Sequence, residues 1–217
     1  ITLINDDPVE KVDRQSKKII TQKGIELEYD ICIFATGSKA FVLPIEGSNL
    51  PSVIGWRTIQ DTEQIIDIAS KKKKAIVIGG GLLGLECARG LLDQGMDVTV
   101  LHLAEWLMEM QLDRKAGDML RADLEKQGMK FELQANSKRI IGHEDVEAVE
   151  LADGRVIETD LVVMAVGIRP YTEVAKDAGL DVQRGIVVND FLQTSDSNIY
   201  AIGECAEHNG KVYGLVA

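Results

Sequence analysis

A glycine-rich turn at residues 79–84 constrains the fold of this 217-residue chain more than any other stretch. An apolar run at residues 75–78 leads into the turn, and apolar residues at helical spacing follow it. In a strand-turn-helix of this kind, Gly79 permits the tight bend, Gly81 lets the backbone approach a pyrophosphate, and Gly84 lets the helix pack closely on the strand. The phosphates would bind the unpaired N–H groups at the positive end of the helix dipole. The pattern predicts a dinucleotide site, with an ordinary glycine-rich turn of a doubly wound fold as the alternative.

The rest of the chain alternates short apolar runs with segments of helical spacing, which is typical of an α/β fold with a parallel sheet. One helix is expected to begin at Thr58, where Thr58 and Asp61 fit a capping pattern, and another is expected over residues 113–127. Three runs between residues 139 and 158, with an Asp-Gly turn, predict an antiparallel meander. Further strands are expected at residues 1–4, 9–12, 18–21, 25–28, 29–34, 75–78, 97–101, 129–133, 161–166, 186–188 and 199–202.

The charge and hydropathy of the sequence exclude some classes of binding partner. The net charge of −11 argues against binding to nucleic acid, because affinity for a phosphate backbone comes from clustered Lys and Arg. The longest apolar runs are only as long as a strand, and the first residues lack a basic region followed by an apolar core. We therefore expect no nucleic-acid partner, no membrane span and no export.

The three cysteines are odd in number and far apart in the sequence, at Cys32, Cys87 and Cys205. They form neither a disulfide framework nor a Cys-x-x-Cys redox pair, and a cytoplasmic protein is expected. Cys205 and His208 have a spacing that metal ligands use, but the other cysteines and histidines are dispersed. No metal site is predicted.

Three strand ends, each followed by glycine, stand in order around the turn: ATG at residues 35–37, VGIRP at 166–170 and IYAIGE at 199–204. This arrangement resembles the flavoproteins with two dinucleotide-binding domains, the pyridine nucleotide-disulfide oxidoreductase family. Residues 188–217, VNDFLQTSDSNIYAIGECAEHNGKVYGLVA, are similar to the flavoprotein portion of the NAD(P)H-dependent assimilatory nitrite reductase large subunits. The resemblance covers nearly all of the chain.

The resemblance implies a division into domains. A Rossmann-like NAD(P)H-binding domain would span residues 58–168, inserted between two segments of an FAD-binding domain at residues 1–57 and 169–217. The Pro- and Gly-rich composition of residues 39–57 favours a boundary there. No second Gly-x-Gly-x-x-Gly turn precedes residue 35, so the FAD-binding domain is expected to be incomplete and the chain to be a fragment.

The resemblance also implies which residues contact the cofactors, FAD and NAD(P)H. Thr36 and Gly37 would lie against FAD, while Gly203 and Glu204 would meet its pyrophosphate and ribityl chain. Family members usually have Asp after that glycine, and Glu204 is one methylene longer. No acid-base catalyst is expected, because the cofactors carry the chemistry. The candidate cofactor-binding residues are Ala35, Thr36, Gly37, Gly79, Gly80, Gly81, Leu82, Leu83, Gly84, Glu86, His102, Val166, Gly167, Gly203 and Glu204.

Residues beside the turn bear on the choice between NADH and NADPH. An acid that binds the ribose hydroxyls usually ends the second strand of the unit, and here that position is His102, with Glu105 as the nearest acid. Because no Arg or Lys stands between residues 97 and 113, NADH is favoured, the alternative being that His102 is simply a surface residue. Glu86, early in the helix, is either an acid favoured by the helix dipole or, as the resemblance implies, a residue on the nicotinamide side.

The function implied is transfer of hydride from NAD(P)H to FAD and of electrons onward to a downstream redox centre or domain, in the reduction of nitrite to ammonia. Iron-sulfur and sirohaem regions would lie outside this sequence. An NADH oxidase or a rubredoxin or ferredoxin reductase of the same family is an alternative, and so is a nucleotide-binding fragment without turnover. The resemblance allows a homodimer.

Overall fold

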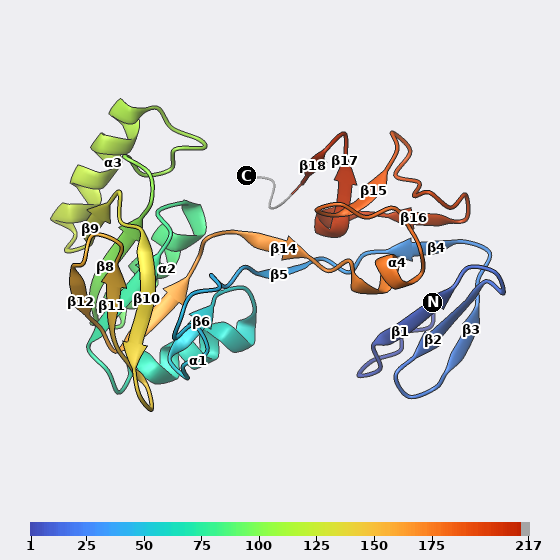
Figure 1. Cartoon of the computed structure of the whole chain (residues 1–217), viewed down its shortest axis with the longest axis horizontal. Helices are drawn as coiled ribbons and strands as arrows, with labels where there is room; N and C mark the ends of the chain where they lie inside the picture. Colours follow the sequence, from blue (N-terminus) through green and yellow to red (C-terminus); the bar gives the residue numbers. More distant parts are fainter. Residues whose placement is uncertain (214–217) are drawn as a thin grey trace. The chain divides into compact units, whose positions relative to one another are not determined.

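The computed structural model describes residues 1–213, which belong to two compact units (Figure 1). One unit comprises residues 40–167, and the other comprises residues 1–39 together with residues 168–213. The expected α/β fold, with a parallel sheet and an antiparallel meander, is confirmed. The compact unit that holds the parallel sheet begins at residue 40, whereas the family resemblance implies an NAD(P)H-binding domain of residues 58–168.

The unit of residues 40–167 is built on a five-stranded parallel sheet. From its central strand the chain moves outward through two strands on one side and later returns to the opposite side, so the strand order reverses at the centre. Such a reversal places a crevice at the carboxyl ends of the strands. In spatial order the strands are β6 (Val53–Gly55), β13 (Leu161–Met164), β7 (Lys74–Ile78), β8 (Asp97–His102) and β9 (Lys130–Leu133).

Three helices cover one face of this sheet: α1 (Ile59–Ala69), α2 (Leu82–Asp93) and α3 (Arg114–Lys126). The predicted cap of α1 is confirmed, because Thr58 Oγ1 accepts the Asp61 N–H at 3.1 Å while the Asp61 carboxylate accepts the Thr58 N–H at 2.6 Å. Within residues 1–213, none of the helices has the length and apolar character that crossing a membrane requires.

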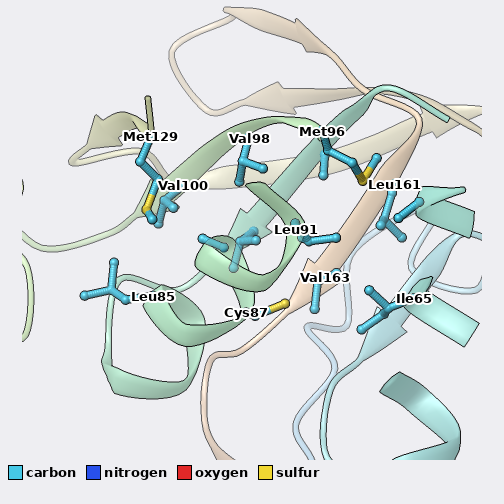
Figure 2. Close-up of a cluster of buried hydrophobic side chains, with 14 of the residues drawn as sticks. Ile65, Leu85, Cys87, Leu91, Met96, Val98, Val100, Met129, Leu161 and Val163 are labelled. Atoms are coloured by element: carbon cyan, nitrogen blue, oxygen red, sulfur yellow. The ribbon is translucent and has the colours of Figure 1, made fainter. Parts of the chain in front are cut away.

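Alternating residues of the strands supply two cores, as the pleat of a sheet requires. Val77 belongs to the core on the helical side of the sheet. Val98 lies in the same core beside Leu91 of α2, which is only 1% exposed (Figure 2). Ile76 and Ile78 face the opposite way and pack on the antiparallel meander. A buried leucine of this kind contributes about 2 to 5 kcal/mol to stability when compared with alanine. The meander consists of β10 (Ser137–Gly142), β11 (Val146–Leu151) and β12 (Val156–Glu158).

The other unit contains several small sheets around a core that includes the fully buried Ile186 and Ile199. An antiparallel sheet is formed by β1 (Val9–Asp13), β2 (Lys18–Thr21) and β3 (Glu26–Glu28). A parallel pair is formed by β4 (Cys32–Phe34) and β16 (Ile199–Ala201). The remaining elements are β5 (Ser38–Ala40) paired with β14 (Ile168–Pro170), the helix α4 (Glu173–Asp177), the 3₁₀ turn η1 (Gly203–Cys205), and the sheet of β15 (Ile186–Val188), β17 (Ala206–His208) and β18 (Lys211–Val212).

Several details of secondary structure differ from expectation. Strands β5, β14, β17 and β18 form where no strand is expected. Residues 1–4 form no strand, and the side chains of Ile1 and Leu3 are exposed rather than paired into a sheet. Residues 53–55 form β6, because they pair with β13 and because Ile54 is buried in the core on the helical side of the sheet. That pairing places residues 40–57 in the same compact unit as the glycine turn.

Candidate functional site

A cleft of about 540 Å³ opens at the carboxyl edge of the parallel sheet. It lies where the strand order reverses, beside the central strand β7 and its neighbours β8 and β13. This is the position at which doubly wound sheets bind ligands. The lining residues lie at or after the carboxyl ends of β7, β8, β9 and β13, or belong to the loop after β8 and to the segment after residue 40. They are Phe41, Leu43, Ile45, Ile78–Leu82, Leu101–Leu103, Glu109–Gln111, Ala135–Ser137 and Ala165–Gly167.

The glycines of the turn differ in the space around them. Gly79 has a φ of +119°, and a Cβ on it would lie 2.4 Å from the carbonyl oxygen of Ala165. A Cβ on Gly84 would lie 1.9 Å from the carbonyl oxygen of Gly79, so α2 approaches the turn as closely as a glycine allows. Among residues 1–213, no neighbouring atom lies within 4 Å of a Cβ placed on Gly81, whose backbone is extended. Gly79 and Gly84 thus allow close packing of the backbone, whereas Gly81 leaves open space beside the cleft.

Helix α2 begins at this open space. Gly81 is its N-cap and provides no side-chain hydrogen bond, so the N–H groups of the first turn keep their donor capacity. Leu82, the first helical residue, lines the cleft. Among residues 1–213, no Lys or Arg lines this cleft, so an anion there would depend on backbone donors and the helix dipole. The geometry fits a pyrophosphate.

His102 is a buried part of the turn and not a surface residue. It is 7% exposed, and its Nδ1 accepts the backbone N–H of Gly80 at 3.0 Å. Since Nδ1 accepts, Nε2 carries the proton, and it lies 2.9 Å from Glu109 Oε2 and 3.1 Å from the carbonyl oxygen of Trp106. The Gly80 carbonyl in turn accepts the N–H of Met108 at 3.1 Å. The loop after β8 is therefore fastened to the glycine turn.

The remaining predicted residues of this unit fall into two groups. Val166 and Gly167 line the cleft, at the end of β13. Leu83 and Glu86 do not line it, and Glu86 is exposed on α2. Glu105, the nearest acid in the sequence, pairs with Arg114 at 3.1 Å instead of facing the cleft. Glu109 reaches the cleft because the loop folds back over the turn, and sequence spacing alone does not reveal this fold-back.

The predicted flavin-binding residues cluster at one edge of the other unit. Because β4 and β16 are parallel and Phe34 pairs with Ala201, the turn at residues 35–37 lies beside the turn at residues 202–204. Both turns contain a left-handed glycine, with φ of +64° at Gly37 and +72° at Gly203. Parallel strands that end together in glycine turns bring backbone N–H groups close to a common ligand.

Side chains at these turns are held by hydrogen bonds. Glu204 Oε2 accepts the Ser38 hydroxyl at 2.7 Å, which joins the two turns. Thr36 donates its hydroxyl to the carbonyl oxygen of Tyr171 at 2.7 Å. A carboxylate at this edge suits ligand hydroxyls better than phosphates, since like charges repel. Ala35 and Thr36 also border an apolar pocket of about 390 Å³ in the same unit.

Cys205 and His208 do not converge. Cys205 is fully buried, with Sγ directed to the carbonyl oxygens of Phe34 and Ile202, while His208 Nε2 lies 2.7 Å from Asp190 Oδ1. Within residues 1–213, no group of three His, Cys, Asp or Glu side chains gathers in the way metal ligands do.

Comparison with known proteins agrees with this geometry. The model of the pyridine nucleotide-disulphide oxidoreductase family matches residues 1–216. The chain is 52% identical over its whole length to a nitrite reductase [NAD(P)H] of Bacillus subtilis (strain 168), covering 27% of that protein. It is 46% identical over its whole length to an assimilatory nitrate reductase electron transfer subunit of the same strain, covering 28% of that protein. The chain therefore spans about a quarter of the length of these relatives.

A solved structure shows the same architecture. The ferredoxin reductase for the CYP199A2 system from Rhodopseudomonas palustris superposes with a TM-score of 0.91 at 32% sequence identity. The match covers 96% of this chain and 52% of the ferredoxin reductase chain. The family resemblance inferred from the strand ends and the glycine turn is confirmed.

Proposed function

Because the chain belongs to the pyridine nucleotide-disulphide oxidoreductase family, we propose that it is the flavoprotein part of an FAD-dependent NAD(P)H oxidoreductase. The observation that carries this proposal is the open position at Gly81, where the N-terminus of α2 meets a cleft at the reversal of strand order. Pyrophosphates bind at such helix N-termini.

Each of the two units would bind a different cofactor. Residues 40–167 would bind the nicotinamide dinucleotide, since Gly79, Gly80 and Gly81 line a cleft wholly within this unit. The other unit would contribute part of the FAD site through the paired turns at residues 35–37 and 203–204. When both cofactors are bound, the nicotinamide supplies hydride and the flavin accepts it. The protein's residues would bind and orient the cofactors and exclude water, with no side chain acting as acid or base.

The identity to a nitrite reductase supports nitrite reduction to ammonia as the overall reaction, with electrons passing to a downstream redox centre. A cytoplasmic location belongs to the same proposal, because all three cysteines are free and buried. A homodimer is the assembly to test by light scattering.

A direct test is to incubate the purified full chain with FAD and NADH. The proposal predicts a yellow protein that reduces an artificial electron-accepting dye with NADH. A colourless protein that binds NADH alone would contradict the enzyme assignment. It would instead support a nucleotide-binding module without turnover, a second candidate that the self-contained cleft of residues 40–167 favours.

A further inference from the structure

We propose that Glu109, positioned by His102, is the residue that selects NADH over NADPH. The inference rests on the proposed binding of a nicotinamide dinucleotide at the glycine turn. The pyrophosphate would lie at the N-terminus of α2, which places the adenosine ribose toward the end of the neighbouring strand β8. The group near that strand end therefore decides whether a 2′-hydroxyl or a 2′-phosphate is accepted.

The residue at the end of β8 cannot perform this selection itself. His102 is buried, its Nδ1 is occupied by the Gly80 N–H, and its Nε2 proton is directed at Glu109 and Trp106. Both ring nitrogens are thus used inside the protein. The histidine instead positions Glu109 relative to the glycine turn. Two successive hydrogen bonds, of 3.0 Å from Gly80 to His102 and 2.9 Å from His102 to Glu109, connect the turn to the carboxylate.

Glu109 has the position and the chemistry to distinguish a ribose 2′-hydroxyl from a 2′-phosphate. It lines the cleft together with the glycine turn, and its side chain is 35% exposed, so a ligand can reach it. Its Oε2 faces His102, whereas Oε1 has no hydrogen-bond partner among residues 1–213. An ionised carboxylate is an acceptor only, so it binds a 2′-hydroxyl and repels a 2′-phosphate.

The surroundings strengthen this selectivity. Within residues 1–213, no Lys or Arg lines the cleft that could neutralise the charge of a 2′-phosphate. Glu105, four residues earlier in the same loop, is paired with Arg114 and does not line the cleft. Glu109 is thus the acidic residue that lines this cleft in the described part of the chain.

Calorimetric titration of the full chain with NADH and with NADPH tests the proposal by binding, independently of turnover. Wild type should bind NADH more tightly. In Glu109→Gln we expect NADH binding to weaken by about tenfold, the loss of one hydrogen bond to a charged group, while NADPH binding stays equal or tightens. Glu105→Gln, the matched control in the same loop, should keep the wild-type ratio of dissociation constants. Glu109→Asp, which retains the charge, should still reject NADPH.

The outcomes separate this inference from the proposed function. If Glu109→Gln keeps the wild-type ratio of dissociation constants for NADPH and NADH, with an unchanged circular dichroism spectrum, the role of Glu109 is overturned while dinucleotide binding stands. Equal affinity of wild type for the two cofactors likewise overturns the role of Glu109. If wild type binds neither cofactor, the inference and the proposed function are both overturned.

Discussion

Gly80 donates its backbone N–H to Nδ1 of His102 over 3.0 Å, so a buried imidazole at the end of β8 fixes the glycine turn at the end of β7. A Cβ on Gly80 would lie 2.7 Å from the His102 ring, which shows how closely the two residues approach. The turn is therefore held in shape before any ligand binds. Preorganisation of this kind lowers the cost of ordering a site on binding.

Replacing this imidazole should affect both the fold and the cleft. His102→Ala leaves the buried Gly80 N–H without its acceptor and opens space beside the turn, which we expect to cost about 1 to 3 kcal/mol of unfolding free energy. Binding of both cofactors should weaken because the turn loses its anchor, and the preference for NADH should fall as well because Glu109 loses its hydrogen bond from His102 Nε2. His143→Ala, which removes an exposed histidine of the same unit, is the control and should change neither quantity. Urea unfolding and calorimetric titration measure the two effects, and wild-type values for His102→Ala would contradict the anchoring role.

Gly84 should be intolerant of any side chain. In Gly84→Ala the added methyl group would lie 1.9 Å from the Gly79 carbonyl oxygen, so α2 must shift away from the turn, at a cost of about 3 kcal/mol or more. In Gly90→Ala, on the same helix, the added methyl group has no neighbour within 4 Å among residues 1–213, and the change should stabilise the protein by about 0.5 to 1 kcal/mol. Denaturation midpoints would decide this, and equal midpoints for the two variants would refute the close approach of α2 to the turn.

Stability should fall in acid partly through Asp145. Burial alone would raise the pKa of this carboxyl, but hydrogen bonds from Lys72 and Ser52 outweigh it and hold the pKa at about 2, below its ordinary value of 3.8. The pair therefore stabilises the fold fully above pH 3.8, and the contribution is lost as the pH falls through 2. Because both side chains are partly exposed, we expect only about 1 kcal/mol.

The measurement is the free energy of unfolding at pH 4 and pH 2 for wild type and Asp145→Asn. The variant should be less stable than wild type at pH 4, and the difference should shrink toward pH 2. Asp93→Asn, which removes an exposed partner of Arg89 on α2, serves as the control and should leave the profile nearly unchanged. A difference that stays constant with pH would count against the role of the Asp145 charge.

The three thiols should be chemically silent in the native protein. Burial raises the pKa of the Cys87 thiol to about 12 and also raises that of Cys32, and Cys205 is fully buried. A disulfide-exchange reagent at pH 8 should label none of them until denaturant is added. Ser16→Cys, at an exposed turn, should react at once and report that the reagent is active. Rapid labelling of the native wild type would mean that one of these cysteines is reactive.

The features that follow from sequence are those that depend on near neighbours. The glycine turn at residues 79–84 and the cap formed by Thr58 and Asp61 are local patterns, and both are present in the structure. Strand β6 escaped prediction because it is only three residues long and pairs with β13, more than a hundred positions away. Its flanking Pro and Gly residues have the composition of a linker.

Prediction of the candidate site from the sequence is limited in the same way, to features that depend on near neighbours. The strand ends that surround the cleft could be read from apolar runs that stop at glycine, as at Gly79 and Gly167. The contact between His102 and Glu109 could not be predicted from the sequence, because it depends on how residues 103–112 fold back across the turn. Exposed histidine and buried histidine look identical in a sequence.

The proposed dinucleotide site is tested most directly by the dissociation constant of NADH for wild type and for Gly81→Ala. The added methyl group has no neighbouring atom within 4 Å in the described part of the chain, so the variant should unfold at nearly the wild-type denaturant concentration. It would occupy the space where the pyrophosphate approaches α2, so NADH binding should weaken by at least about tenfold. Gly90→Ala should bind NADH as wild type does. If Gly81→Ala binds NADH with wild-type affinity, the cleft at the glycine turn is not the dinucleotide site.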